Sequence, residues 1–332
     1  MPMRLMSKIL ITMLAVQCVV GAIACARRGP SNVDADVAAS AERFGVGQII
    51  DTTTGRSVSI DQVVERVEQQ EVLYLGEEHH NRFHIEYALA LINRLLSKSR
   101  QPIIAMEMFA WDNQALLNRY LMGDDLNRQE FLEQVGWPKN WGGPFEDYEP
   151  LVALAMTERL RLAAMNPPKA IIRSVARMGL EQARKDPDWS RWRLQGETIV
   201  DDPLYREKII RQLRACHDGG PDEMYQAMYE ASMVRDEGMA ITVVSLVEEV
   251  RTERNTRAGP VVTYTGGGHI QFNLPVPKRV ARRLSGQVRQ VSIYMTTFEE
   301  GRLKDIQEMI QGKIADYVWL TPLGAHGAPR RC

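Results

Sequence analysis

Cysteine is scarce in this chain of 332 residues, which contains only four. Cys18 and Cys25 lie in the N-terminal segment, which leaves Cys216 and Cys332 for the rest of the chain. A disulfide framework stabilises small secreted domains, and two cysteines in a chain of this size do not form one. We expect Cys216, in a predicted helix, and Cys332, at the C-terminus, to remain unpaired, although an oxidising compartment would permit them to pair.

Long apolar runs are also missing, except for one near the N-terminus. Residues 9–20 form an apolar run behind a short basic segment, and the run is too short to cross a membrane comfortably. This pattern predicts a signal peptide over residues 1–24. No other run approaches membrane-spanning length, so we expect the folded body to lie in water, attached to the membrane through a lipid anchor only.

The end of the predicted signal peptide resembles a lipobox. Residues 22–25 read Ala-Ile-Ala-Cys, and in bacterial lipoproteins the cysteine of this motif is acylated. We therefore expect lipidation of Cys25, a tether over residues 25–43, and a location at the outer membrane or the periplasmic face of the envelope. The alternative is an ordinary secretory peptide cut near Ala24, and both readings place the protein outside the cytoplasm.

The chain has no excess of positive charge. It carries 41 basic and 42 acidic residues, for a formal net charge of −1. Domains that bind nucleic acid carry a basic patch or stripe that neutralises phosphates. We therefore expect no nucleic-acid partner.

Several motifs of known chemistry are absent. The chain lacks His-Glu-x-x-His and Gly-x-Ser-x-Gly, which argues against a thermolysin-like metalloprotease and an α/β-hydrolase. It also lacks Cys-x-x-Cys-His, so any haem is not covalently attached.

Short apolar runs alternate with segments of helical periodicity. The runs at residues 72–75, 102–108, 160–165, 260–265 and 289–294 predict strands, and amphipathic segments separate several of them. Such alternation is typical of an α/β fold, with a mainly parallel sheet flanked by helices.

Residues 174–251 interrupt this alternation with an almost wholly helical pattern. We predict an α/β domain over residues 44–300 that carries a large helical insertion at about 174–251. Residues 301–332 are expected to form a C-terminal helix and a disordered tail.

Polar groups that can carry chemistry follow three of the predicted strands. Glu77, His79 and His84 lie after the first of them, Glu107 lies near the end of the second, and His269 follows a run of three glycines after a late strand. The carboxyl ends of parallel strands meet at one edge of a sheet, where ligands bind. We therefore expect these side chains to converge.

Two chemistries fit the five residues. A histidine held by a carboxylate can act as a general base in a hydrolase. Alternatively, His79, His84 and His269 can ligate a divalent metal that activates water. A solvated loop with a helix cap is the structural alternative, so the sequence leaves open whether the chain is an enzyme.

An ordered set of motifs in the chain resembles the ChaN-like haem-binding lipoprotein family, over roughly residues 45–285. That family belongs to a wider group with erythromycin esterases and Tiki-type metalloproteases. The motifs are Gly76-Glu77-Glu78-His79 with His84, Glu107-Met108-Phe109, Asp112-Asn113-Gln114, Trp141, Tyr148-Glu149-Pro150, Ala164-Met165-Asn166-Pro167, Arg235-Asp236-Glu237 with Met239-Ala240, and Gly266 to His269. The resemblance implies an α/β body with a helical insertion, a lipid anchor, a homodimer that holds haem between its subunits with a tyrosine on the iron, and a role in iron uptake.

The resemblance suggests three haem-site residues. Tyr148 is the first choice for the iron ligand, because it lies in an aromatic loop that matches a family motif and tyrosine is a known haem ligand. Arg235 is a candidate partner for a propionate, with a structural ion pair as the alternative. Met228 belongs to a helical stripe of Met and Tyr that suits an adaptable pocket, although such stripes are more often part of a core.

Overall fold

The computed structural model describes residues 44–123, 125–192, 194–217, 219–325 and 327. The predicted signal peptide, the predicted tether, the predicted lipidation site Cys25 and the terminal Cys332 lie outside these residues. No helix in the described part of the chain is both long and apolar enough to cross a membrane.

Eight strands form one sheet in the order β2-β1-β8-β7-β3-β6-β4-β5. All pairings from β8 to β5 are parallel, and β1 pairs antiparallel with β2 and β8 at one edge. The strands are β1 (Ile49–Asp51), β2 (Arg56–Val58), β3 (Val72–Glu77), β4 (Gln101–Ala110), β5 (Leu162–Asn166), β6 (Ala258–Gly266), β7 (Gln290–Thr297) and β8 (Tyr317–Thr321). The predicted α/β fold is thereby confirmed.

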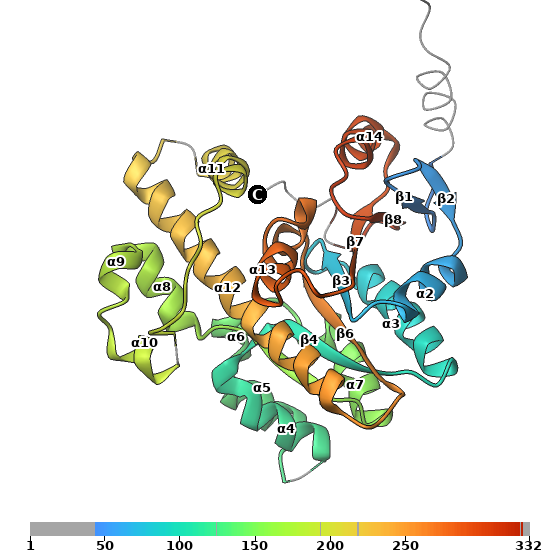
Figure 1. Cartoon of the computed structure of the whole chain (residues 1–332), viewed down its shortest axis with the longest axis horizontal. Coiled ribbons are helices and arrows are strands. Elements are labelled where there is room, and N and C mark those ends of the chain that lie inside the picture. Colours follow the sequence, from blue (N-terminus) through green and yellow to red (C-terminus); the bar gives the residue numbers. More distant parts are fainter. Residues whose placement is uncertain (1–43, 124, 193, 218, 326, 328–332) are drawn as a thin grey trace, which may run out of the picture.

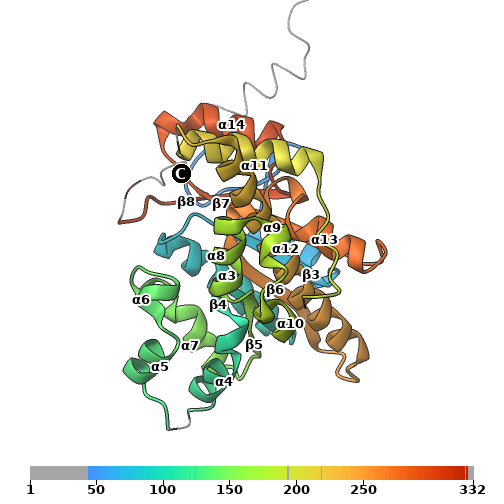
Figure 2. The same ribbon diagram turned by 90° about the vertical axis from the view of Figure 1, so that its left-hand side faces the viewer.

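One face of the sheet packs against the helices of the first half of the chain. Leu73 and Leu75 of β3 belong to the hydrophobic core on this face. Helices α4, α5 and α6 gather beside α7 there (Figure 2). The helices on this face are α2 (Ile60–Glu68), α3 (Arg82–Ser97), α4 (Gln114–Met122), α5 (Arg128–Gln134), α6 (Trp137–Asn140) and α7 (Glu149–Thr157).

The opposite face packs against α12 (Asp222–Thr252) and α13 (Val276–Arg283). Val72 and Tyr74 contribute to this second core, so alternate residues of β3 point to opposite faces, as strand geometry requires. Because both faces are covered, β3 is a continuous buried run.

The predicted helical insertion is present between β5 and β6. Its shorter helices are α8 (Lys169–Met178), α9 (Leu180–Ala183), α10 (Pro187–Arg191) and α11 (Pro203–Cys216). The long helix α12 crosses the sheet, with α8, α9 and α10 on one side of its first half and α11 on the other (Figure 1).

A fully buried carboxylate on α12 forms ion pairs with arginines of α13. Glu237 is 0% exposed and accepts from Arg282 and Arg283 at distances of 2.7 and 2.9 Å, with Arg279 at 3.3 Å. A buried charge is tolerated only when it is paired in this way. The next residue, Gly238, lets Pro167 approach, because a Cβ there would lie 2.1 Å from the Pro167 ring.

The sheet extends beyond residue 300, where the sequence prediction ended the domain. Helix α14 (Leu303–Gln311) leads into β8, which lies between β1 and β7. Val318 and Leu320 of β8 pack in a core with Ile306 of α14. Residues 301–321 are therefore part of the same α/β body.

Candidate functional site

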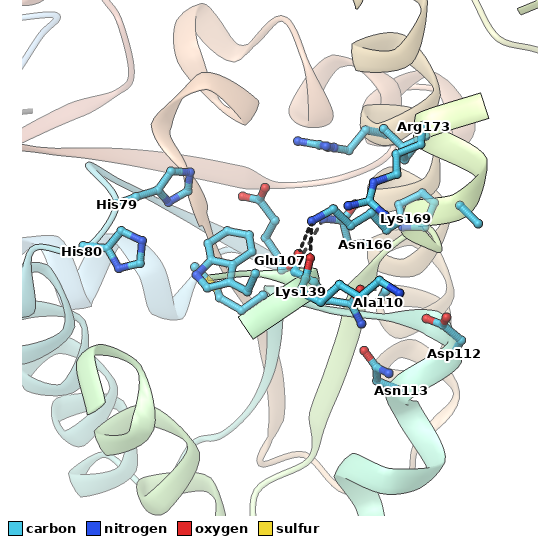
Figure 3. Close-up of a pocket in the computed structure, with 17 residues that line it drawn as sticks. His79, His80, Glu107, Ala110, Asp112, Asn113, Lys139, Asn166, Lys169 and Arg173 are labelled. Atoms are coloured by element: carbon cyan, nitrogen blue, oxygen red, sulfur yellow. Dashed lines mark hydrogen bonds between the residues drawn. The ribbon is translucent and has the colours of Figure 1, made fainter. Parts of the chain in front are cut away.

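A cavity of about 470 Å³ lies at the carboxyl ends of β3, β4 and β5. Its walls come from the loop after β3, from β4 and the turn that follows it, from α6, and from α8 and α12 of the insertion. Figure 3 shows His79 and His80 on one side of the cavity, Lys169 and Arg173 on the opposite side, and Glu107 between them. This is the sheet edge at which the sequence predicted convergence.

The loop after β3 places His79 through a short turn into α3. Asn81 caps α3, with its side chain accepting from the backbone N–H of Phe83 at 3.0 Å. His80 adopts a left-handed backbone conformation, with φ of 63°, which reverses the chain between strand and helix. The strand end is therefore held while His79 projects toward the cavity.

Glu77 holds one nitrogen of the His79 ring. Nδ1 of His79 lies 2.7 Å from Oε1 of Glu77, whose side chain is 1% exposed, whereas the His79 side chain is 45% exposed. Tyr148 and Tyr264 also donate to this carboxylate, at 3.0 and 2.7 Å. Because Glu77 is surrounded by donors, Nδ1–H of His79 donates and Nε2 is left with its lone pair.

The pKa values of this pair follow from burial and their mutual attraction. Burial raises the pKa of Glu77, and its hydrogen bonds to His79 and the two tyrosines offset part of that rise. Burial alone would lower the pKa of His79, but the hydrogen bond and charge of Glu77 outweigh it and raise this pKa.

A second buried pair lies beside the first. Nε2 of His269 lies 3.2 Å from Oε1 of Glu107, and its Nδ1 lies 2.6 Å from Oδ1 of Asp236. Oε2 of Glu107 accepts from the backbone N–H of Gly266 at 2.7 Å, and Asp236 also accepts from Tyr205. His269 is therefore held between two carboxylates from different elements.

This arrangement favours the charged forms of His269 and Glu107. Burial alone would lower the pKa of His269, but Glu107 and Asp236 raise it to about 10. Burial alone would raise the pKa of Glu107, but the charge and hydrogen bond of His269 take that pKa well below its usual range. His269 is thus an imidazolium ion at neutral pH.

The structure does not bring His84 to the cavity. His84 is 0% exposed, its Nδ1 accepts from the backbone N–H of Glu78 at 3.0 Å, and its Nε2 lies 2.9 Å from Oγ1 of Thr321. Burial lowers the pKa of His84 to about 4, so the ring is neutral. Of the five predicted residues, the structure joins Glu77, His79, Glu107 and His269.

The divalent-metal reading is not supported by the described part of the chain. Among those residues, no group of three or more His, Cys, Asp or Glu side chains is arranged to hold a metal ion. Of the three histidines predicted as ligands, His84 is bonded elsewhere and both nitrogens of His269 face carboxylates.

Comparison with known proteins gives the family. A sequence model described as "Haem-binding uptake, Tiki superfamily, ChaN" matches residues 63–280, which is most of the chain. The chain belongs to this family. The match covers β3 to β6 and with them every residue of the two buried pairs.

A solved structure shares the fold of this ChaN family member. A structure of ChaN of Campylobacter jejuni, described as showing cofacial haem binding, is similar with a TM-score of 0.61 and 18% identity, over 82% of this chain and 95% of that one. An erythromycin esterase mutant in its open conformation gives a TM-score of 0.43 and 14% identity, over 76% of each chain. The first likeness shows a shared fold, and the second is too low to support an argument.

Curated proteins also match the chain, each over less than half of its own length. Protein RETICULATA-RELATED 5, chloroplastic, of Arabidopsis thaliana is 23% identical over 81% of this chain and 36% of its own length. The chain spans less than half the length of the curated relatives it matches.

The three predicted haem residues occupy different surroundings in this ChaN family member. Arg235 lines the cavity, whereas Tyr148 and Met228 do not. Tyr148 is 0% exposed, and burial together with the charge of Glu77 raises the pKa of Tyr148 far above its usual value. Met228 is half-buried on α12.

Three residues that shape the site were not among the predicted site residues, although Trp141 and Asp236 belong to recognised family motifs. Asp236 and Tyr264 are buried partners of His269 and Glu77, and Trp141 packs edge-on against His79 with ring centroids 5.1 Å apart. Asp236 lay within a recognised family motif, but its position on a long predicted helix hid its burial. An acidic residue between apolar positions of a helix was the available signal.

Proposed function

We propose that this chain binds haem in the cavity at the carboxyl ends of β3, β4 and β5. The observation that carries the proposal is the match of residues 63–280 to a haem-binding family, in a chain whose matched region contains this cavity. The volume of about 470 Å³ falls within the range of roughly 300–1,000 Å³ that is common for small-molecule sites. A bound haem would supply an iron centre and two anionic propionates.

The cations of the cavity support the proposal. Nε of Arg235 is buried without an acceptor among the described residues, and Arg173 forms no ion pair with any carboxylate of that part of the chain. Lys169 donates to the backbone carbonyls of Lys139 and Asn140 at 2.8 and 2.9 Å, which leaves its charge unneutralised. A buried donor without a partner costs about 1–3 kcal/mol, and a propionate would remove that cost.

An absorption titration with haem tests the proposal. We expect a saturable Soret shift for the unaltered chain and an affinity lower by about tenfold or more for Arg235→Gln, since a hydrogen bond to a charged group contributes about 1.5–3 kcal/mol. Arg211→Gln is the matched control, because Arg211 is exposed on α11 and pairs only locally with Glu207. The absence of any saturable shift in the unaltered chain would refute the proposal.

We extend the proposal to haem or iron uptake at the cell envelope. Support comes from the family description and from the predicted lipidation of Cys25. A strain without the protein should grow poorly on haem as its iron source, and Arg235→Gln should restore growth less well than the unaltered chain. In Cys25→Ala, the protein should leave the membrane fraction.

A homodimer is part of the same proposal, because the resemblance implies haem held between two subunits. Sedimentation of the protein with and without haem tests it. A dimer that forms or strengthens with haem supports the shared site, and a monomer at saturating haem contradicts it.

Acid–base hydrolysis is the second candidate function. It is favoured by the pairing of His79 with Glu77, which leaves Nε2 available as a general base beside the cavity. Glu107 and His269 would then supply a fixed charge pair near the reacting group. Cleavage of a chromogenic ester that is lost in His79→Ala and retained in His84→Asn would support this function.

A further inference from the structure

The cavity at the carboxyl ends of β3, β4 and β5 carries more positive than negative charge. Four lysine and arginine side chains line it, whereas its only two carboxylates are those of Glu107 and Asp112. Glu107 is already balanced, because it faces Nε2 of His269 at 3.2 Å and accepts from the backbone N–H of Gly266 at 2.7 Å. The four cations are Lys139, Lys169, Arg173 and Arg235.

Three of these cations lie close together without a carboxylate partner. Lys169 and Arg173 lie one turn apart on α8 and face the cavity from the same side (Figure 3). Nζ of Lys169 donates only to two backbone carbonyls, at 2.8 and 2.9 Å, and Nε of Arg235 has no acceptor among the described residues. Burial lowers the pKa of Lys169, and the charges of Arg173 and Arg235 lower it further. The three cations therefore repel one another, and an anion between them would relieve that repulsion.

The start of helix α8 adds to this cluster of cations. Lys169 is the first residue of α8, the preceding Pro168 provides no side-chain cap, and Ala170 also lines the cavity. The first N–H groups of a helix have no acceptor within the helix, and together with the helix dipole they favour an anion. The helix end thus supports a site that the three side chains already form.

The number of unneutralised cations fits a doubly charged ligand. A phosphate monoester carries a charge of about −1.5 to −2 at pH 7 and three strong acceptor oxygens, more than a single carboxylate offers. Arginine and lysine are the side chains that most often bind phosphate in proteins. We infer that Lys169, Arg173 and Arg235 bind the phosphate group of a small, hydroxylated phosphate monoester.

The rest of the lining fits the hydroxylated part of such a molecule. Asp112, Asn113, Asn140 and Asn166 all line the cavity, and their side chains can accept or donate hydrogen bonds to hydroxyl groups. The volume of about 470 Å³ leaves room for a body of a few carbon atoms beside the phosphate. This inference goes beyond the proposed haem function and does not rest on it.

Isothermal titration calorimetry of the unaltered chain, without haem, tests the inference. The probes are inorganic phosphate, ribose 5-phosphate and, as the uncharged counterpart, ribose. We expect saturable binding of inorganic phosphate, tighter binding of ribose 5-phosphate because its hydroxyls add contacts, and no binding of ribose. Both phosphates should bind more weakly as the salt concentration rises, since salt screens the attraction.

Arg173→Gln is the decisive variant. Arg173 is exposed on α8, so its replacement leaves the core intact. Affinity for ribose 5-phosphate should fall by about tenfold or more, as expected for the loss of a hydrogen bond between charged groups. Arg177→Gln is the matched control, because Arg177 is exposed one turn further along α8, outside the lining of this cavity, and its replacement removes the same charge. This control should bind ribose 5-phosphate as the unaltered chain does.

The outcomes separate this inference from the proposed haem function. Absence of saturable binding of both phosphates would overturn the inference, as would equal weakening in Arg173→Gln and Arg177→Gln, which indicates only a general attraction to positive charge. Equal affinities for inorganic phosphate and ribose 5-phosphate would overturn the assignment of a hydroxylated ester. Because the titrations contain no haem, a chain that fails to bind haem can still confirm the phosphate site, and a chain that fails here can still bind haem.

Discussion

Asp236, in the middle of α12, holds Nδ1 of His269 at 2.6 Å, while Glu107 faces the other nitrogen of the same ring. The helical insertion is therefore bonded directly to the group that follows β6. Asp236 and Glu107 are both almost fully buried, so their charges are balanced by the imidazolium and, for Glu107, by nearby Arg235. The site is a charge network shared by the sheet and the insertion.

Replacing Asp236 should weaken this network. In Asp236→Asn the ring loses one negative neighbour, so the pKa of His269 should fall below its value of about 10. Breaking a buried ion pair costs about 3–5 kcal/mol, and the free energy of unfolding should drop by that order. NMR titration of the His269 ring protons and urea unfolding measure the two effects.

The direction of the His269 pKa shift decides how stability changes with pH. Because the pKa of His269 is raised in the folded state, its contribution is fully present below the unfolded-state pKa of about 6.5 and is lost as pH rises toward 10. In Asp236→Asn that loss should be smaller and should be complete at a lower pH, because only the folded-state pKa changes. An unchanged alkaline limb would contradict the pairing of Asp236 with His269.

His84 should make the folded chain less stable at acid pH. Its pKa is lowered to about 4 by burial, so an unfolded chain takes up a proton between about pH 6.5 and 4 that the folded chain does not. Stability is therefore full above pH 6.5 and falls by about 3 kcal/mol as the pH drops to 4.

His84→Asn isolates this contribution. Oδ1 of the asparagine can accept the backbone N–H of Glu78 as Nδ1 does, but the side chain does not titrate. Urea unfolding between pH 7 and 4 should therefore show a flatter decline in the variant than in the unaltered chain. Equal slopes would show that folding does not lower the pKa of His84.

The sequence predicted the strands β3 to β7 because their apolar runs are short and largely buried. The N-termini of α2 and α5 also carry a signal that can be read from the sequence, because Ser59 with Gln62 and Asn127 with Glu130 form capping boxes there. These are local signals, and they do not depend on distant parts of the chain. The C-terminal limit of the domain was harder to predict from the sequence. Strand β8 joins the sheet by pairing with β7 and with β1, and β1 lies far from it in the sequence.

The sequence predicted only part of the candidate site. Glu77, Glu107 and His269 follow strands, and parallel strands bring their carboxyl ends together whatever the intervening chain does. His84 was grouped with them by its nearness in sequence, but it lies on the buried face of α3 and is turned away from the cavity. Asp236 reaches the site only because α12 folds back over the sheet, which the sequence pattern alone did not indicate.

Tyr148→Phe should leave the haem spectrum unchanged. The hydroxyl of Tyr148 donates to Glu77 at 3.0 Å and is buried, so its loss should remove one hydrogen bond, worth about 1 kcal/mol of stability, and no iron ligand. Absorption spectra of the haem complex and thermal unfolding measure the two effects. If the Tyr148→Phe variant loses the original spectrum, Tyr148 is the iron ligand.

Gly266 should control the position of His79. A Cβ at Gly266 would lie 2.7 Å from both Cε1 and Nε2 of the His79 ring, closer than real contacts allow. Gly266→Ala must therefore displace the imidazole from its place beside Glu107, and we expect weaker haem binding with a shifted Soret band.

Gly268→Ala is the matched control, two residues along the same glycine run. A Cβ at Gly268 would meet nothing within 4 Å, and its φ is not in the left-handed region. Haem titration should therefore separate the two variants, with Gly268→Ala close to the unaltered chain and Gly266→Ala weaker, because the displaced His79 ring lines the cavity. If both variants bind haem as the unaltered chain does, the close packing of His79 on β6 has no part in haem binding, and the ring must be free to move when the ligand enters.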